Sequence, residues 1–210
     1  MTLVSNDGQI ADGNRLVVRT SAGIVYAIAR DISASEIHVF KKDPSDVFTQ
    51  QDSVNSPTGA DTDAVACAIS STNVISIVWW DVGTGLRHVT FDTGTDTFGT
   101  PETAQAEDLP ISEKYVAVAI DTNDDPHACY LDGTGGIPIN RPIAYYTNKI
   151  GGSWNARVTV AGGNPDDVFI NSDIMIGKPT AAIGADRPLI LLFGDLGIGF
   201  VGNAYHGDAL

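Results

Sequence analysis

Short apolar runs separated by polar turns dominate the chain, and the clearest group of them lies between residues 114 and 160. Alternating runs of this length, bounded by Asp, Asn, Gly and Pro, are typical of antiparallel strands. A single four-stranded meander cannot bury both of its faces, so this unit must pack against others. The pattern predicts strands at Tyr115–Ile120, His127–Leu131, Ile143–Thr147 and Trp154–Val160.

Weaker copies of the same unit recur along the chain. The second run of each copy ends at an aspartate, and these aspartates are spaced by 50, 51 and 63 residues. A period near 50 with four strands per unit is the signature of a β-propeller. A β-sandwich is the alternative, but sandwiches do not repeat their turns in register. The aspartates are Asp31, Asp81, Asp132 and Asp195, and the aromatic residues that open a fourth run are Phe48, Phe98 and Trp154.

We therefore predict an all-β fold, a single β-propeller domain over residues 1–210 with about four four-stranded antiparallel blades. Residues 2–10 would close the last blade as its outer strand beside Ile198–His206, because an open edge leaves backbone groups unpaired. A larger ring, completed by other chains or by further sequence, is the alternative. The blades are expected at about 14–57, 63–105, 114–161 and 173–210 plus 2–10.

The segments AIDTNDDPHACY and IAYYTNKIGGSW resemble the blade repeat of BNR/Asp-box-like, sialidase-type β-propellers found in bacterial surface and phage proteins. The resemblance is good over residues 114–160, partial over 63–105, and weaker over 15–56 and 173–206. The Asp-box motif itself, Ser-x-Asp-x-Gly-x-x-Trp, is intact nowhere in the sequence. The resemblance therefore implies a propeller fold and says much less about an activity.

Sialidase chemistry, which the resemblance raises, would need three arginines around a carboxylate, a Tyr–Glu nucleophile pair and an acid/base aspartate. Only Arg15, Arg19 and Arg187 lie near the start of a predicted inner strand or its following turn, and no Tyr–Glu pair is apparent. A G-x-S-x-G nucleophile motif does not occur either. We therefore predict no catalytic residues and a protein that is not an enzyme, with a sialidase-like glycoside hydrolase as an alternative.

The stretch DTNDD at residues 121–125 has the opening spacing of a calcium loop. It lacks the glycine at the sixth position and the distal glutamate, so we expect a turn between strands. Cys67 and Cys129 are expected to be buried thiols rather than a disulfide. No metal site or cofactor is predicted. The histidines His38, His88, His127 and His206 are far apart in sequence, and the first two are expected at matching positions of two repeats.

Acidic side chains outnumber basic ones and give a formal net charge of −14. An acidic surface repels nucleic-acid phosphates and anionic membranes, so neither is expected as a partner. The sequence has no run of eighteen apolar residues, and its first ten residues lack the basic start and apolar core of a signal peptide. The location is uncertain, with a virion or an extracellular surface favoured.

These observations favour a non-catalytic binding or structural module, such as a phage virion or tail component or a surface-recognition protein. A lectin-like, carbohydrate-binding propeller is an alternative, and the partner would be a protein or glycan surface. Trp79 and Trp80 are candidate glycan contacts, because neighbouring strand residues point to opposite faces and one of the two must leave the inner face. A virion part would form homo-oligomers and offer loop tips such as Ile137–Ile139 for contact. The pattern does not identify a ligand-binding residue.

Overall fold

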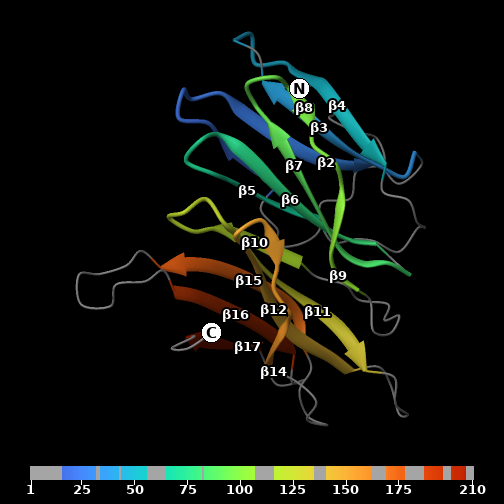
Figure 1. The fold of residues 1–210 in the computed structure, drawn as a ribbon, viewed down its shortest axis with the longest axis vertical. Helices are drawn as coiled ribbons and strands as arrows, with labels where there is room; N and C mark the ends of the chain where they lie inside the picture. The colour runs from blue at the N-terminus through green and yellow to red at the C-terminus, as the bar shows by residue number, and fades with distance from the viewer. Residues whose placement is uncertain are drawn as a thin grey trace.

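Short strands packed as four antiparallel sheets make up the computed structural model (Figure 1). Every regular element in the described ranges is a strand, and these ranges hold no helix long and apolar enough to cross a membrane. The structure describes residues 16–31, 34–42, 44–55, 65–81, 83–106, 116–134, 141–161, 169–177, 187–195 and 200–206.

Each sheet is an antiparallel meander, with the exception that β9 pairs with β7 and β14 pairs with β12 instead of with the strand immediately before them. The first sheet contains β1 (Val17–Arg19), β2 (Val25–Asp31), β3 (Glu36–Lys42) and β4 (Phe48–Asn55). The second contains β5 (Val65–Ile69), β6 (Val74–Asp81), β7 (Gly85–Asp92), β8 (Thr97–Phe98) and β9 (Glu102–Ala106). The third contains β10 (Val116–Ile120), β11 (Pro126–Thr134), β12 (Arg141–Ile150), β13 (Ser153–Trp154) and β14 (Val158–Ala161). The fourth contains β15 (Phe169–Gly177), β16 (Arg187–Asp195) and β17 (Phe200–His206).

Most of the repeated aspartates fall where the sequence places them. Asp31, Asp81 and Asp195 are the last residues of β2, β6 and β16, but the prediction at Asp132 needs a correction, because β11 continues two residues further to Thr134. The predicted strand Trp154–Val160 needs a correction, because residues 155–157 interrupt it. At this break the Asn155 backbone N–H donates to the Asn148 carbonyl oxygen (2.8 Å), so β13 and β14 pair with β12 separately. The fourth strand of the second sheet is broken in the same way, into β8 and β9.

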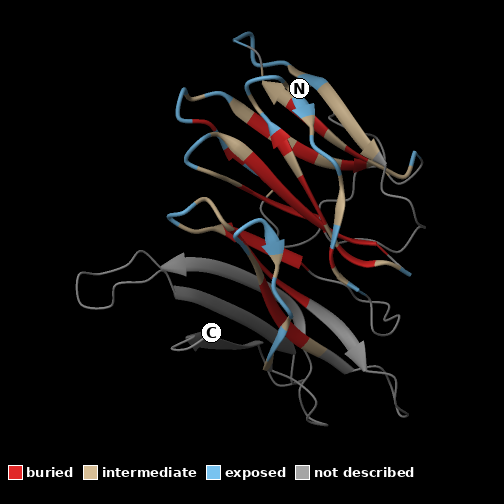
Figure 2. Cartoon of the chain, viewed as in Figure 1, coloured by how far each residue is buried: buried red, intermediate tan, exposed pale blue. Residues whose placement is uncertain are grey.

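The buried side chains lie between neighbouring sheets, where Figure 2 shows them as the red segments of the inner strands. One cluster joins the first and second sheets and includes Tyr26, Ile77 and Trp79. Another joins the second and third sheets and includes Trp80 and Tyr130. The sheets therefore cover one another's faces, as the short repeated units require.

These features confirm the predicted all-β fold with antiparallel sheets. The first three sheets have four strand positions, the last of which is broken in the second and third sheets, and the fourth sheet has three strands in the described residues. The number of blades and the closure of a ring stay predictions. The proposed closing strand, residues 2–10, lies outside the described residues, and so do the loop tips Ile137 and Ile139.

The turns after β1, β5 and β10 share one geometry, which explains the sequence DTNDD. In each turn the first side chain accepts a hydrogen bond from the backbone N–H four residues later, as Asp121 does from Asp125 (2.9 Å). The fourth residue has a positive φ, between 65° and 87°, which Gly, Asn and Asp tolerate best. The prediction of a strand–strand turn at residues 121–125 is confirmed. The first residues of the three turns are Thr20, Ser70 and Asp121, and the fourth are Gly23, Asn73 and Asp124.

The same turns also connect neighbouring sheets. The Ser21 backbone N–H donates to Asn73 Oδ1 (2.7 Å), and the Ser71 backbone N–H donates to Asp124 Oδ1 (2.7 Å). The Ser71 hydroxyl adds a second bond to Asp124 Oδ2 (2.8 Å). Hydrogen bonds from the Ser71 backbone and side chain lower the pKa of Asp124. Asn73 and Asp124 therefore have two roles: each permits the positive φ of its own turn and holds the turn of the preceding sheet.

Candidate functional site

The structure corrects two of the sequence-based site candidates. Trp79 and Trp80 do point to opposite faces of β6, but both are buried, at 1% and 0% exposure. Each fills a core between two sheets, so neither is available to a glycan. Cys67 and Cys129 are buried and not joined in a disulfide, as predicted.

The structure does not place His38 and His88 at matching positions, so that prediction is wrong. His88 pairs with Val78, whose side chain is buried toward the third sheet. In the first sheet the corresponding position is occupied by Val39, while His38 pairs with Ala29. The connection after β2 is one residue longer than the connection after β6. A shift of one residue moves a strand side chain to the other face of its sheet.

Two of the three arginines that sialidase chemistry would need lie in the described residues, in separate strands. Arg19 lies exposed in β1, where its Nε donates to the Gly23 carbonyl oxygen (3.2 Å). Arg187 begins β16, and Arg15 lies outside the described residues.

A groove of about 300 Å³ opens where the second and third sheets meet. Strand and turn residues of both sheets line it, and most of them carry a hydroxyl, a carboxylate, an ammonium or an imidazole group. The two sheets therefore bring hydrogen-bond donors and acceptors together at one opening. The lining residues are Ser70, Thr72, Val74, Ser76, His88, Thr90, Asp124, Asp125, Pro126, Lys149 and Gly152.

Glu102 organises the side chains at one side of this groove. Its Oε1 accepts hydrogen bonds from His88 Nδ1 (2.7 Å), Lys149 Nζ (2.5 Å) and Trp154 Nε1 (3.1 Å). These donors come from β7, β12 and β13, so the cluster spans both sheets. The Trp154 ring also packs edge-on against the His88 ring, with centroids 5.2 Å apart. Glu102 therefore holds two groove residues, His88 and Lys149, in fixed positions.

The other ring nitrogen of His88 faces a hydroxyl. His88 Nε2 lies 3.4 Å from Ser76 Oγ, on the neighbouring strand β6. Both residues line the groove, and their exposures are 2% and 6%. Serine, histidine and glutamate thus stand in a row on three adjacent strands, β6, β7 and β9.

Burial sets the protonation of His88. Burial lowers its pKa, the positive charge of Lys149 adds to that effect, and Glu102 opposes both without reversing the shift. For Glu102, burial raises the pKa, but the hydrogen bonds from Lys149, His88 and Trp154 outweigh burial and leave its pKa lowered. At neutral pH the cluster therefore contains a neutral imidazole, a carboxylate and an ammonium group.

Acidification is expected to destabilise the protein in two windows. The folded-state pKa of His88 lies below 6.5, so the unfolded chain binds a proton first and stability falls once the pH drops below about 6.5. Glu102 adds a second loss as the pH falls from about 4.5 through its lowered folded-state pKa. Thermal unfolding from pH 7.5 to pH 5 should show a decline in Tm that is smaller in His88→Gln. An equal decline in both proteins would contradict the assignment to His88.

A second cluster of titratable groups lies inside the third sheet. His127 Nδ1 lies 2.6 Å from the Tyr146 hydroxyl, and His127 Nε2 lies 3.4 Å from Asp121 Oδ2. Burial raises the pKa of Tyr146 to about 12. All three side chains are buried, which suits a packing role better than ligand contact.

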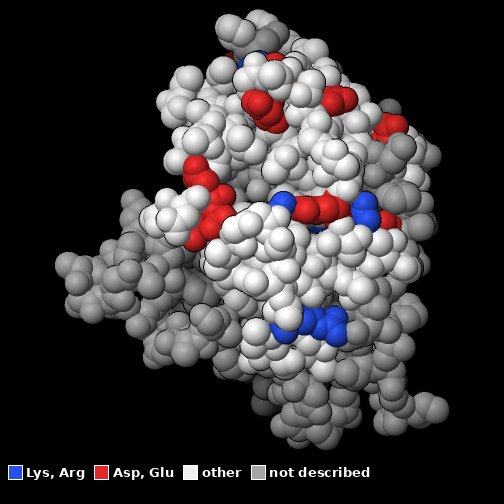
Figure 3. Space-filling model, viewed as in Figure 1, with Lys and Arg blue, Asp and Glu red and all other residues white. Residues whose placement is uncertain are grey.

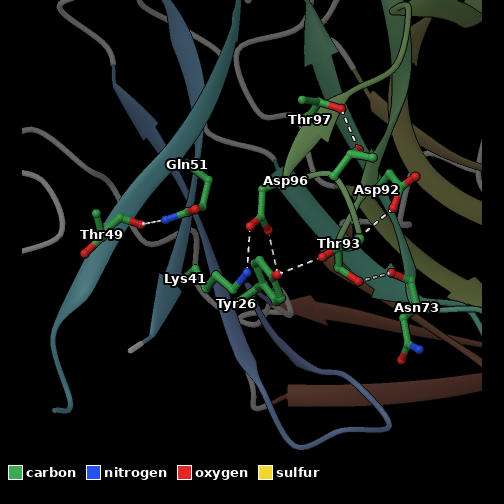
Figure 4. A network of polar contacts seen from close by, with 11 residues as sticks. Tyr26, Lys41, Thr49, Gln51, Asn73, Asp92, Thr93, Asp96 and Thr97 are labelled. Atoms are coloured by element: carbon green, nitrogen blue, oxygen red, sulfur yellow. Dashed lines mark hydrogen bonds and ion pairs between the residues drawn. The ribbon is translucent and has the colours of Figure 1, made fainter. Parts of the chain in front are cut away.

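A further network, shown in Figure 4, joins the first and second sheets in a way that resembles the Glu102 cluster. Asp96 contacts the Tyr26 hydroxyl with Oδ1 (2.7 Å) and accepts from Lys41 Nζ with Oδ2 (2.6 Å). Tyr26 is fully buried, and burial together with Asp96 raises the pKa of its hydroxyl. A groove of about 620 Å³ beside this network, lined by Lys41, Lys42 and other residues, belongs to the first sheet alone. It has fewer convergent polar groups than the groove between the second and third sheets.

Sequence reasoning placed Glu102 in a turn or linker and did not single out Lys149. Glu102 begins β9, and the pattern ETAQA shows too little apolar character to be identified as a strand. Among the described residues, no group of three or more His, Cys, Asp or Glu side chains is arranged to hold a metal ion.

No protein-family model matches the sequence, and no curated protein matches it. Solved structures do share the fold. A lectin from Aleuria aurantia aligns with a TM-score of 0.58 at 11% identity, over 92% of this chain and 62% of the lectin chain. An α-L-arabinofuranosidase from Podospora anserina aligns with a TM-score of 0.54 at 15% identity, over 98% of this chain and 67% of the enzyme. A PL25 ulvan lyase aligns with a TM-score of 0.51 at 16% identity, over 89% of this chain.

These neighbours are β-propellers, so the sheets described above form a propeller-like fold. The propeller part of the predicted resemblance is confirmed, and the sialidase-type assignment stays a prediction. The chain spans 54% of the length of the ulvan lyase and 62% of the length of the lectin.

Proposed function

We propose that the protein is a lectin-like carbohydrate-binding module that holds a glycan in the groove between the second and third sheets without cleaving glycosidic bonds. The observation that carries the proposal is the convergence of polar groups from two sheets on one opening. Binding sites for small molecules are usually concave and use a few fixed polar groups for specificity.

The groove offers what sugar hydroxyl groups need. Asp125 presents carboxylate oxygens as acceptors, and Lys149 presents an ammonium group as a donor. The Ser and Thr hydroxyls can do either. The hydrogen bond to Glu102 already holds the Lys149 side chain in position, so less side-chain entropy is lost when a ligand binds. A hydroxyl-rich ligand therefore finds both kinds of partner in a pre-ordered arrangement.

The structural neighbours support this choice over a virion component. One is a lectin in complex with Fucα1-6GlcNAc, one is an arabinofuranosidase in complex with cellotriose, and one is a polysaccharide lyase. Because their sequences are at most 16% identical to this chain, they support a shared fold but assign no role to any residue. A lectin-like role follows by analogy at the level of the fold, and the groove supplies the chemistry.

Charge favours neutral glycans as ligands. The net charge is −14, and Figure 3 shows Asp and Glu side chains at several places on the viewed face, with Lys and Arg side chains in only a few. Two aspartates also line the groove. Polyanionic glycans would be repelled, whereas neutral hydroxyl groups would not.

A glycan array followed by calorimetric titration tests the proposal. We expect binding to a neutral oligosaccharide with no release of reducing ends, and a roughly tenfold loss of affinity in Lys149→Ala, because one charge-assisted hydrogen bond contributes about 1.5 kcal/mol or more. Lys42→Ala, in the groove of the first sheet, is the matched control and should bind normally. Failure to bind any array glycan, or an affinity loss in Lys42→Ala alone, would contradict the proposed site.

A further inference from the structure

Two groove residues, Ser76 and His88, form a row with Glu102 next to the groove, an arrangement that sugar binding alone does not require. We propose that Ser76, His88 and Glu102 form a nucleophilic triad that hydrolyses short acyl esters. Glu102 Oε1 accepts from His88 Nδ1 at 2.7 Å, and His88 Nε2 faces Ser76 Oγ at 3.4 Å. This order, with the carboxylate on Nδ1 and the hydroxyl on Nε2, is the order that a serine nucleophile needs.

The carboxylate fixes the tautomer of the histidine. Since Glu102 is an acceptor, the proton of His88 lies on Nδ1 and the lone pair of Nε2 points at Ser76. A neutral imidazole in this orientation can take the proton of the hydroxyl. Burial lowers the pKa of His88 and keeps the ring neutral near pH 7, which agrees with the geometry. The 3.4 Å separation is longer than a strong hydrogen bond, but such contacts often tighten only when a substrate is bound.

The backbone makes the row rigid. Ser76 lies in β6, His88 in β7 and Glu102 in β9, and β7 pairs directly with the other two strands. Sites on paired strands hold their geometry better than sites on loops. Both Ser76 and His88 line the groove, whose volume of about 300 Å³ suits a small acyl group. Lys149 and the Thr90 hydroxyl line the same opening and are donors for a developing oxyanion.

The chemistry needs only water as co-reactant. Ser76 Oγ bonds to the ester carbonyl carbon while His88 Nε2 takes the hydroxyl proton. The bond from that carbon to the alkoxy oxygen then breaks, and His88 returns the proton to the leaving alcohol. Water attacks the acyl-serine in the same way, with His88 taking one proton, and the carboxylic acid leaves as Ser76 recovers its hydrogen. No glycosidic bond is involved, so the proposal does not depend on which glycan binds.

The test uses covalent labelling and a chromogenic ester. We expect the intact mass to increase by one adduct after treatment with a fluorophosphonate, with the label on the peptide that contains Ser76. We also expect turnover of p-nitrophenyl acetate that Ser76→Ala abolishes and His88→Gln lowers by at least about 100-fold, the usual contribution of a general base. Ser53→Ala, in the first sheet, is the control and should keep full activity.

The alternative is that Ser76 and Glu102 serve only as hydrogen-bond partners of the buried His88 side chain. In that case the folded wild-type protein takes up no label at Ser76 and hydrolyses the ester no faster than Ser76→Ala, which would overturn the proposal. Thermal melts of each variant show that it is folded, and Ser76→Cys gives a second nucleophile whose acylation by the same ester can be followed by mass. Because the ester carries no sugar, failure of this test leaves the glycan titration unaffected.

Discussion

Replacing Trp80 with alanine is expected to lower the free energy of unfolding by about 4 kcal/mol, the usual cost of removing a fully buried tryptophan. Trp80 is 0% exposed and packs in the core between the second and third sheets. Its ring lies 5.6 Å from that of Tyr130. The substitution removes a contact between two sheets as well as apolar area within one. Urea unfolding followed by circular dichroism would measure the change.

Trp80→Phe should cost much less, about 1 to 2 kcal/mol, because it keeps most of the buried aromatic surface. Trp154→Ala is a useful comparison, since Trp154 is only partly buried and packs at the edge of the same cluster. Equal losses of unfolding free energy for Trp80→Ala and Trp154→Ala would show that the core between these sheets contributes less to stability than expected.

The second large effect is expected at Glu102. Glu102→Ala should lower the free energy of unfolding by about 2 kcal/mol, because His88, Lys149 and Trp154 lose their common acceptor and a polar group left without its partner costs about 1 to 3 kcal/mol. Glu102→Gln keeps the shape and one acceptor oxygen, so its effect should be about half as large. Urea unfolding at pH 7.5 would measure both variants.

Glu36 provides the matched control for this prediction. It accepts from His38 at 2.9 Å on the first sheet, without the three-donor arrangement found at Glu102. Glu36→Ala should therefore cost no more than about 1 kcal/mol, because only one donor loses its acceptor. If Glu36→Ala and Glu102→Ala destabilise the protein equally, Glu102 does not organise the groove.

Much of the fold could be predicted from the repeated pattern. Aspartates at the ends of β2, β6 and β16 and the turn DTNDD were identified because turn chemistry depends on neighbouring residues. Packing between strands depends on register, and register depends on loop length. One additional residue after β2 therefore separated His38 from the face that His88 occupies, although their spacing in the sequence looked equal.

The candidate site was much harder to predict. Trp79 and Trp80 suggested exposed glycan contacts, but the second sheet is covered by the first sheet on one face and by the third on the other, so both side chains are buried. Glu102 and Lys149 are 47 residues apart in sequence and meet only because consecutive sheets stack. Contacts between sheets leave no local pattern, and a single sequence does not reveal them.

The central claim is that a glycan binds between the second and third sheets. A crystal structure of the protein with the oligosaccharide that binds best on the array would test it most directly. We predict density for the sugar in the groove, within hydrogen-bond distance of Lys149 and Asp125. A sugar bound elsewhere, for example beside Lys42 on the first sheet, would contradict the account.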